Sequence, residues 1–403
     1  MKKTHCKVIA VNKSEKIFID LIRKSVFNED IKLTYSIEES NMEELICIAK
    51  RHFCQAFIWK ALKMCDAQIP DNLDKLVKLF IFRNLNNLSV QNKVVKVLRE
   101  NNIKCAVLKG SSVASFYKEP LLRLLGDIDI LVSEEDFDKT VDIFLQGQEK
   151  NEKSAKHEFH YALRFEGFSV EIHKHIIESE DENALSAGIV GNWIKDAQTG
   201  RLDEFEFPVL KTEHQAVSLL LHMKRHMKEN NINFRLLLDW LVFSDSISTD
   251  VWNGKVYPQL KELKLHKLAD ALLCLSDKYF KTDNADKIHN NFSDEVVDML
   301  ISDFLLSGAG NSTDKSSGFV AAVYAESNKK SSILKMVDAL NARSYKWFKI
   351  SRYKMLLPVC WLILAVRYVF GVVTGRREKI TLSGVKQSAK RKERLHKELD
   401  LKN

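Results

Sequence analysis

The chain has 403 residues, of which 45% are hydrophobic, and a formal net charge of +8. This length allows two or three packed domains, and the hydrophobic content excludes a disordered chain. From residue 375 to the end there are ten Lys or Arg and four Asp or Glu, so this segment carries +6 and the rest of the chain only +2. A protein that binds a long nucleic acid usually carries its excess of basic residues on the folded domain. Here the excess lies in the C-terminal segment, so we do not expect polynucleotide binding.

The remaining composition indicates a helical, cytoplasmic protein. Only 14 Gly and 5 Pro interrupt the chain. The 7 cysteines are scattered without a Cys-x-x-Cys pair, which favours reduced thiols over disulfides or a zinc site. No apolar run of signal-peptide length follows the first residues, so we do not expect export.

Helices are predicted for the N-terminal region, where residues 43–62 and 72–99 each carry apolar side chains at helical spacing. The period then changes. Residues 104–109 predict a short strand, 111–117 a helix and 127–133 a second apolar strand.

A helix is predicted after the second strand, because Ser133 and Asp136 form a capping box. Residues 159–165 and 168–176 predict a hairpin that turns at 166–167. These strands complete a small mixed sheet.

The chain is predicted to be helical again beyond residue 208. Thr212 and Gln215 form a second capping box, and residues 234–243 give the next helix. The polar, turn-rich stretch 307–318 predicts a loop.

Residues 355–373 form an apolar stretch of about the length of a membrane span, with basic residues on both sides. Pro358 lies near its start and Arg367 within it, and an Arg near the bilayer centre costs about 2.5–3.5 kcal/mol on insertion scales. We therefore favour a packed or interface-lying helix over a span. Two alternatives remain open: a final core helix with a solvated basic tail, or peripheral membrane contact through 355–403.

Acidic residues on the predicted strands indicate a metal site. Asp127 and Asp129 alternate with apolar residues, so both project from one side of the strand. Paired carboxylates repel each other, and a divalent cation removes that cost. Glu171, between Val170 and Ile172, is the candidate third carboxylate. His173 and His175 share its face.

The turn at Gly110 and Ser111 follows the first predicted strand and is suited to phosphate, since glycine lets the backbone approach closely and Ser111 can donate from its hydroxyl. Lys109 is a further candidate for phosphate contact. Each motif alone also has a simpler interpretation. The Gly110–Ser111 segment could be an ordinary turn, and Asp127 with Asp129 could be a charge pair on an edge strand.

Five further residues are candidates for a functional or a structural role. Arg123 could contact phosphate or tie its loop to the acidic pair by a salt bridge. His222 and His226, one helical turn apart, could bind metal, but helix packing is favoured. Arg235 and Asp239 are spaced for an ion pair within one helix.

Taken in order, these motifs resemble the polymerase-β-like nucleotidyltransferase superfamily, and within it the bacterial group called nucleotidyltransferase family proteins. The residues that carry the resemblance are Leu108-Lys109-Gly110-Ser111, Arg123, Gly126-Asp127-Ile128-Asp129-Ile130-Leu131-Val132, Val170-Glu171-Ile172-His173, His222, His226, Arg235 and Asp239. It covers residues 103–243 well and the flanking regions less closely.

The resemblance implies a metal-dependent enzyme that uses Mg²⁺ or Mn²⁺ and a nucleoside triphosphate. Asp127, Asp129 and Glu171 are then the catalytic, metal-binding carboxylates. The nucleotide is held by Gly110 and Ser111, with Lys109 and Arg123 as further candidates.

We therefore expect an α+β fold in which a small mixed-sheet nucleotidyltransferase core lies between helical regions. The expected division is an N-terminal helical region 1–102, the core 103–210, a C-terminal helical domain 211–350, and the apolar helix with its basic tail 351–403. The expected reaction moves a nucleoside monophosphate onto a hydroxyl of a small molecule or a protein and releases pyrophosphate.

Two other functions remain open. Asp-x-Asp after an apolar strand is also typical of glycosyltransferases that bind a nucleotide sugar. The fold could also be a catalytically retired nucleotide-sensing or interaction module, either antitoxin-like or an adaptor at a membrane surface.

Overall fold

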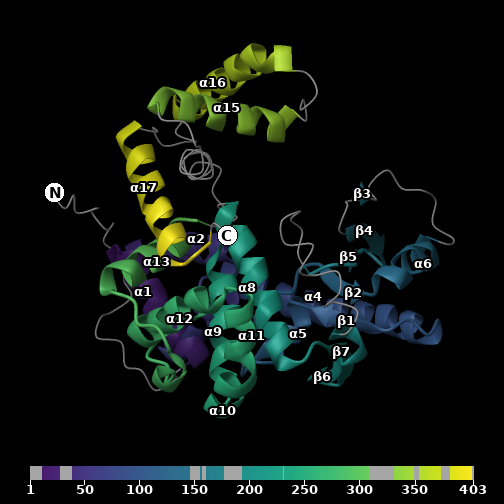
Figure 1. The fold of residues 1–403 in the computed structure, drawn as a ribbon. Coiled ribbons are helices and arrows are strands. Elements are labelled where there is room, and N and C mark those ends of the chain that lie inside the picture. Colours follow the sequence, from purple (N-terminus) through teal and green to yellow (C-terminus); the bar gives the residue numbers. More distant parts are fainter. Residues whose placement is uncertain are drawn as a thin grey trace.

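The computed structural model contains a seven-stranded mixed sheet that lies to one side of a larger group of helices, which confirms the α+β class (Figure 1). The residues that it describes are 11–27, 39–145, 155–156, 160–176, 193–229, 231–307, 331–348, 354–373 and 382–401.

Four α-helices are described in the N-terminal region. Their bounds are α1 (Lys13–Ile22), α2 (Glu39–His52), α3 (Gln55–Met64) and α4 (Asp71–Glu100). The apolar stripe predicted over 43–62 is not one helix, because Phe53 adopts a left-handed backbone with φ of 58° and separates α2 from α3. The stripe continues across the break because both helices pack on the same core.

Helix α4 buries Leu73 and Leu88 but leaves other apolar residues of the predicted stripe exposed. Leu79 is 64% exposed and Leu85 37% exposed. Three amide side chains, Asn84, Asn87 and Gln91, are buried in their place. Buried amides need hydrogen-bond partners, so this face of α4 serves a polar contact as well as an apolar one.

The strands are β1 (Cys105–Leu108), β2 (Ile128–Val132), β3 (Ala155–Lys156), β4 (His160–Phe165), β5 (Phe168–His173), β6 (Gln198–Leu202) and β7 (Phe205–Val209). Their order is β3-β4-β5-β2-β1-β7-β6. β2 pairs with β1 in antiparallel and with β5 in parallel orientation, so it lies at the centre of the sheet. The β6–β7 hairpin was not predicted from the sequence.

Local signals around the central strands act as predicted. The Ser133 Oγ accepts a hydrogen bond of 3.1 Å from the Asp136 backbone N–H, and α6 (Glu134–Leu145) follows. The β4–β5 hairpin turns at Glu166 and Gly167, whose φ values are 47° and 84°. Short α5 (Gly110–Ala114) follows β1.

The remaining helices are α8 (Thr212–Lys228), α9 (Phe234–Ser246), α10 (Thr249–Val251), α11 (Tyr257–Glu262), α12 (His266–Leu275), α13 (Asp294–Leu306), α15 (Ser332–Phe348), α16 (Leu357–Val373) and α17 (Leu382–Glu398). The capping box predicted at Thr212 is wrong. Lys211 is the N-cap of α8 and makes no side-chain cap bond. Gln215 instead donates from Nε2 to the Ser112 carbonyl of α5, 3.2 Å away. Most of the predicted loop 307–318 lies outside the described residues.

Buried apolar side chains form two clusters. One joins the N-terminal helices α1–α3 to α8–α13, and the other joins the sheet to the second half of α4 and to α6. The four-part domain division stays a prediction. No helix in the described ranges has both the length and the apolar character needed to cross a membrane.

The C-terminal helix α17 packs against the body, so the prediction of a solvated basic tail is wrong for this segment. Lys392 Nζ lies 3.2 Å from Asp303 Oδ1 on α13, and both side chains are buried. Leu395 and Leu399 join the larger apolar cluster. The basic residues of α17 fit here because α13 supplies the opposite charges.

Candidate functional site

The register of the central strands brings two acidic residues side by side. Asp129 of β2 lies opposite Glu171 of β5 in the parallel pair, and opposite Leu108 of β1 in the antiparallel pair. Lys109 follows Leu108 directly, so it also lies beside Asp129. Asp127 precedes β2 and is two residues from Asp129, which places it on the same side of the strand.

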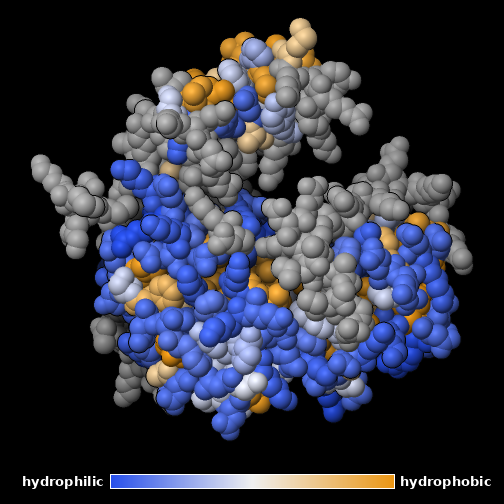
Figure 2. Space-filling view, viewed as in Figure 1, coloured by the Kyte–Doolittle hydropathy of each residue, from blue (hydrophilic) through white to orange (hydrophobic). Residues whose placement is uncertain are grey.

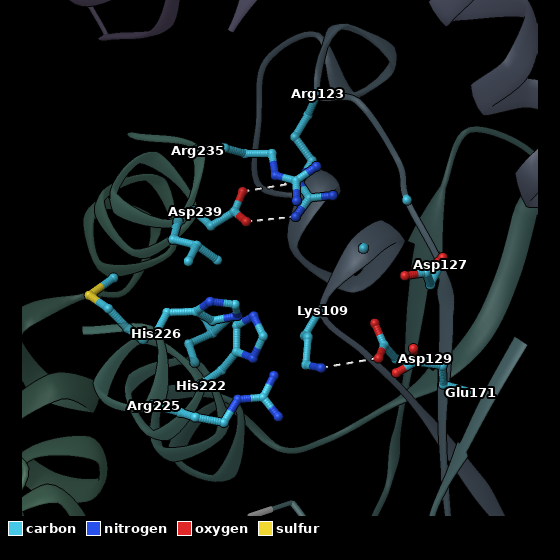
Figure 3. Close-up of a pocket in the computed structure, with 15 residues that line it drawn as sticks. Lys109, Arg123, Asp127, Asp129, Glu171, His222, Arg225, His226, Arg235 and Asp239 are labelled. Atoms are coloured by element: carbon cyan, nitrogen blue, oxygen red, sulfur yellow. Dashed lines mark hydrogen bonds and ion pairs between the residues drawn. The ribbon is translucent and has the colours of Figure 1, made fainter. Parts of the chain in front are cut away.

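A cavity of about 270 Å³ lies over these residues. Its strand side is acidic, and its other side is formed by α8 and α9, whose basic and histidine side chains point toward the strands (Figure 3). The lining residues are Lys109, Gly110, Arg123, Gly126, Asp127, Asp129, Glu171, Leu219, His222, Met223, Arg225, His226, Arg235, Leu236 and Asp239.

Asp129 is the buried centre of the acidic side. Its Oδ1 accepts from Lys109 Nζ at 3.0 Å and lies 3.0 Å from His173 Nε2. Burial alone would raise the pKa of Asp129, but the Lys109 ammonium and the His173 ring outweigh it and hold the pKa well below its usual value. Asp129 is therefore a carboxylate with two partners already in place.

Glu171 and His173 complete a cluster with Asp129. His173 Nε2 lies 3.4 Å from Glu171 Oε2, and this contact lowers the pKa of Glu171 against the opposing effects of burial and of Asp129. One ligand atom from each of the three residues lies within 4.8 Å of the others. Two carboxylates suit Mg²⁺ or Mn²⁺, and a histidine can either ligate a softer ion or orient the carboxylates. The donor set thus fits a divalent cation.

Asp127 lines the same cavity but is exposed and does not belong to that cluster. Desolvation by the walls of the cavity, the negative charge of Glu171 and that of Asp129 together raise the pKa of Asp127. These three carboxylates therefore repel one another. The third member of the cluster is His173 and not Asp127, which was predicted for it. The sequence indicated His173 only through its position on the same strand face as Glu171.

The turn between β1 and α5 lies beside Asp127. Lys109 and Gly110 have φ values of 48° and 39°, and a Cβ on Gly110 would lie 3.8 Å from the Asp127 carbonyl oxygen. Ser111 is oriented differently, since its buried hydroxyl donates to Gln91 Oε1 of α4 at 2.6 Å. The Ser111 side chain would have to leave Gln91 to reach a phosphate.

Arg123 is held by a buried bidentate ion pair. Its Nε lies 3.0 Å from Asp239 Oδ1 and its Nη2 lies 2.6 Å from Asp239 Oδ2, while Tyr117 Oη donates to the same carboxylate at 2.9 Å. The salt bridge foreseen for Arg123 therefore has a partner on α9 and not in the Asp127–Asp129 pair. The expected ion pair within α9 is wrong, because Asp239 is engaged by Arg123 and Arg235 donates to the Leu124 carbonyl at 3.1 Å.

Helix α4 positions the loop that leads into β2. Asn84 Nδ2 donates to the carbonyls of Leu121 and Arg123 at 2.8 and 3.0 Å, and its Oδ1 accepts from the Leu125 N–H at 2.9 Å. Asn87 Nδ2 donates to the Gly126 carbonyl at 2.9 Å. Together with Gln91, these amides form one polar strip along α4. This support was not predicted from the sequence, because the strip lies inside a helix with apolar periodicity.

His222 and His226 line the cavity from α8, with ring centroids 4.4 Å apart. Burial lowers the pKa of His226 to about 4 and, together with Lys109, lowers that of His222 well below its usual value. Both rings are therefore neutral at pH 7. Neither belongs to the cluster of potential metal ligands found among the described residues.

A family model described as an uncharacterised nucleotidyltransferase matches residues 38–281. The chain belongs to this nucleotidyltransferase family. The matched segment contains every residue that lines the cavity, as well as α4, whereas α13 and the helices after it lie outside. No curated protein has a significant sequence match to the chain.

Proposed function

We propose that this nucleotidyltransferase moves a nucleoside monophosphate from a nucleoside triphosphate to a hydroxyl of a small molecule or a protein. The observation that carries the proposal is the pairing of Asp129 with Glu171 across two parallel strands, at one side of a cavity whose other side carries basic residues. The small net charge of residues 1–374, +2, supports a small acceptor over a polynucleotide. We propose a cytoplasmic location.

In this proposal Asp127, Asp129 and Glu171 hold Mg²⁺ or Mn²⁺, with His173 as ligand or orienting group. Bound divalent cations neutralise the triphosphate and make the acceptor hydroxyl more acidic. Glu171 accepts the hydroxyl proton. The acceptor oxygen forms a bond to the α-phosphorus, the bond from that phosphorus to the bridging oxygen breaks, and pyrophosphate leaves with its electron pair.

The nucleotide side of the cavity is proposed to use the turn after β1. Gly110 lets the backbone approach the phosphates, and Lys109 brings a positive charge to them. The Ser111 backbone N–H and the Arg123 guanidinium are the further proposed contacts. Arg123 would reach the nucleotide with the second N–H of Nη1, because Nε and Nη2 donate to Asp239 and Nη1 already donates once to the Leu124 carbonyl, 3.2 Å away.

Incubation of the purified protein with labelled nucleoside triphosphates and Mg²⁺ or Mn²⁺ tests the proposal. We expect pyrophosphate release together with labelling of an acceptor, and at least about a hundredfold loss in Asp129→Asn, because Asn is nearly isosteric but a poorer metal ligand. Asp142→Asn on the exposed face of α6 makes the same charge change away from the cavity and should leave turnover unchanged.

Equal turnover in Asp129→Asn would overturn the assigned role of the carboxylates. Nucleotide binding without any pyrophosphate release would instead favour a retired sensing or interaction module. Release of a nucleoside diphosphate from a nucleotide sugar would favour the glycosyltransferase alternative.

A further inference from the structure

Helix α16 carries an exposed apolar surface. Among the described residues, 13 large apolar side chains are exposed, and nine of them lie between residues 355 and 373. Figure 2 shows these apolar atoms gathered over the α15–α16 hairpin, while most of the visible body is hydrophilic. Monomeric soluble proteins rarely expose a contiguous apolar patch of more than a few hundred Å², so this surface needs a partner.

The exposed side chains form one stripe along the helix. They are Met355, Val359, Leu362, Val366, Val369 and Val373, each three or four positions after the last, with exposed fractions from 55% to 93%. The opposite face is covered, since Cys360 and Leu364 are buried and α16 packs against α15. The stripe is therefore directed away from the rest of the hairpin.

The charge pattern around the stripe identifies the partner. Arg367 is the only charged residue in α16. Within residues 329–379, however, there are twelve Lys or Arg and only two Asp or Glu. A helical protein partner would be matched by charged residues along both edges of the stripe, but here Ile363 and Phe370 extend the apolar surface. An apolar helix with basic residues before and after it fits a lipid surface with anionic headgroups.

We propose that α16 lies in the interface of an anionic membrane, with its stripe among the acyl chains and the neighbouring Lys and Arg at the headgroups. The nucleotide chemistry does not enter this inference, which goes beyond the proposed function. The contact is limited to the α15–α16 hairpin and excludes α17. Two cations of α17 are engaged by α13, Lys392 by Asp303 and Arg394 by Glu295.

Co-sedimentation of the full-length protein with vesicles tests the proposal. Vesicles of phosphatidylcholine with phosphatidylserine should bind the protein more tightly than phosphatidylcholine alone, and added salt should weaken binding. The double variant Leu362→Asp/Val366→Asp should lower vesicle partitioning by at least about tenfold. Leu79→Asp/Phe82→Asp on α4 is the matched control, because both of its side chains are 64% exposed, and it should bind like the wild type.

Circular dichroism of both double variants checks that the changes leave the fold intact. Equal vesicle binding by the two variants would overturn the proposal. So would an absence of binding in the wild type, together with a concentration-dependent dimer that the α16 variant abolishes; a second copy of the chain would then cover the stripe.

Discussion

At the residue scale, Asp239 is the centre of a buried hydrogen-bond network that its position in the sequence does not indicate. Its two carboxylate oxygens accept hydrogen bonds from Nε and Nη2 of Arg123, and Oδ1 also accepts one from the Tyr117 hydroxyl. All three side chains are buried. Burial and the neighbouring carboxylate raise the pKa of Tyr117 well above its usual value, so the phenol stays a hydrogen-bond donor. This network fastens the loop before β2 to helix α9 and so fixes one side of the cavity relative to the other.

We expect Asp239→Ala to lower the free energy of unfolding by about 3–5 kcal/mol, because it leaves the buried Arg123 cation without a partner. Urea unfolding measures this change. The double variant Arg123→Met/Asp239→Leu, which removes both charges, should recover most of the loss. A single-variant loss below about 1 kcal/mol, the usual worth of an exposed pair, would contradict the buried network.

At the element scale, α4 is the support on which the candidate site is built. Its amide strip holds the loop before β2 through Asn84 and Asn87, and the turn after β1 through Gln91. The turn after β1 and the loop that leads to the carboxylates of β2 are thus both held by one helix.

Asn84→Ala should lower the free energy of unfolding by about 2–4 kcal/mol, because it leaves one buried carbonyl, one part-buried carbonyl and one buried N–H without their partner. Chemical denaturation measures the loss. Asn86→Ala changes an exposed amide two residues along the same helix and should change stability by less than about 0.5 kcal/mol. Equal effects of the two substitutions would show that the buried amides of α4 do not contribute to the free energy of unfolding.

The sequence predicted the central elements well, because their signals are local. Alternating apolar residues specify β2, and the Ser133 capping box specifies α6. The β6–β7 hairpin was missed, since residues 198–209 carry polar and charged side chains on an edge of the sheet and alternate weakly. The partners of Arg123 and Ser111 could not be predicted, because Asp239 and Gln91 lie far away in sequence and only packing brings them near.

At the scale of the whole molecule, His52 connects α2 with α9 and α13 inside the larger apolar cluster. It is buried at the end of α2, where its Nδ1 accepts from the Phe234 N–H of α9 and its Nε2 lies 3.2 Å from the Leu305 carbonyl of α13. The Phe234 N–H leaves no room for a second proton on the ring. Burial and the nearby Arg51 lower the pKa of His52 to about 3.

This histidine should make the folded state sensitive to acid. As pH falls below about 6.5, the ring becomes protonated in the unfolded chain but stays neutral in the folded one, so stability is lost between about pH 6.5 and 3. The contribution of this group is about 1.4 kcal/mol per pH unit in that window. His52→Gln should be less stable at pH 7 and should show a shallower loss on acidification, measured by denaturation at several pH values.

The substitution His289→Gln, at an exposed position, is the control. Its stability should change with pH as that of the wild type does. An unchanged slope in His52→Gln would mean that other groups carry the acid sensitivity.

Everything proposed for catalysis depends on whether Asp129, Glu171 and their neighbours bind a divalent cation together. Titration of the full-length protein with Mn²⁺, followed by electron paramagnetic resonance of the free ion, measures this directly. We predict saturable binding that Asp129→Asn and Glu171→Gln each weaken by at least about tenfold, while Asp142→Asn binds like the wild type. Binding that is equal in all four proteins, or absent from the wild type, would contradict the account.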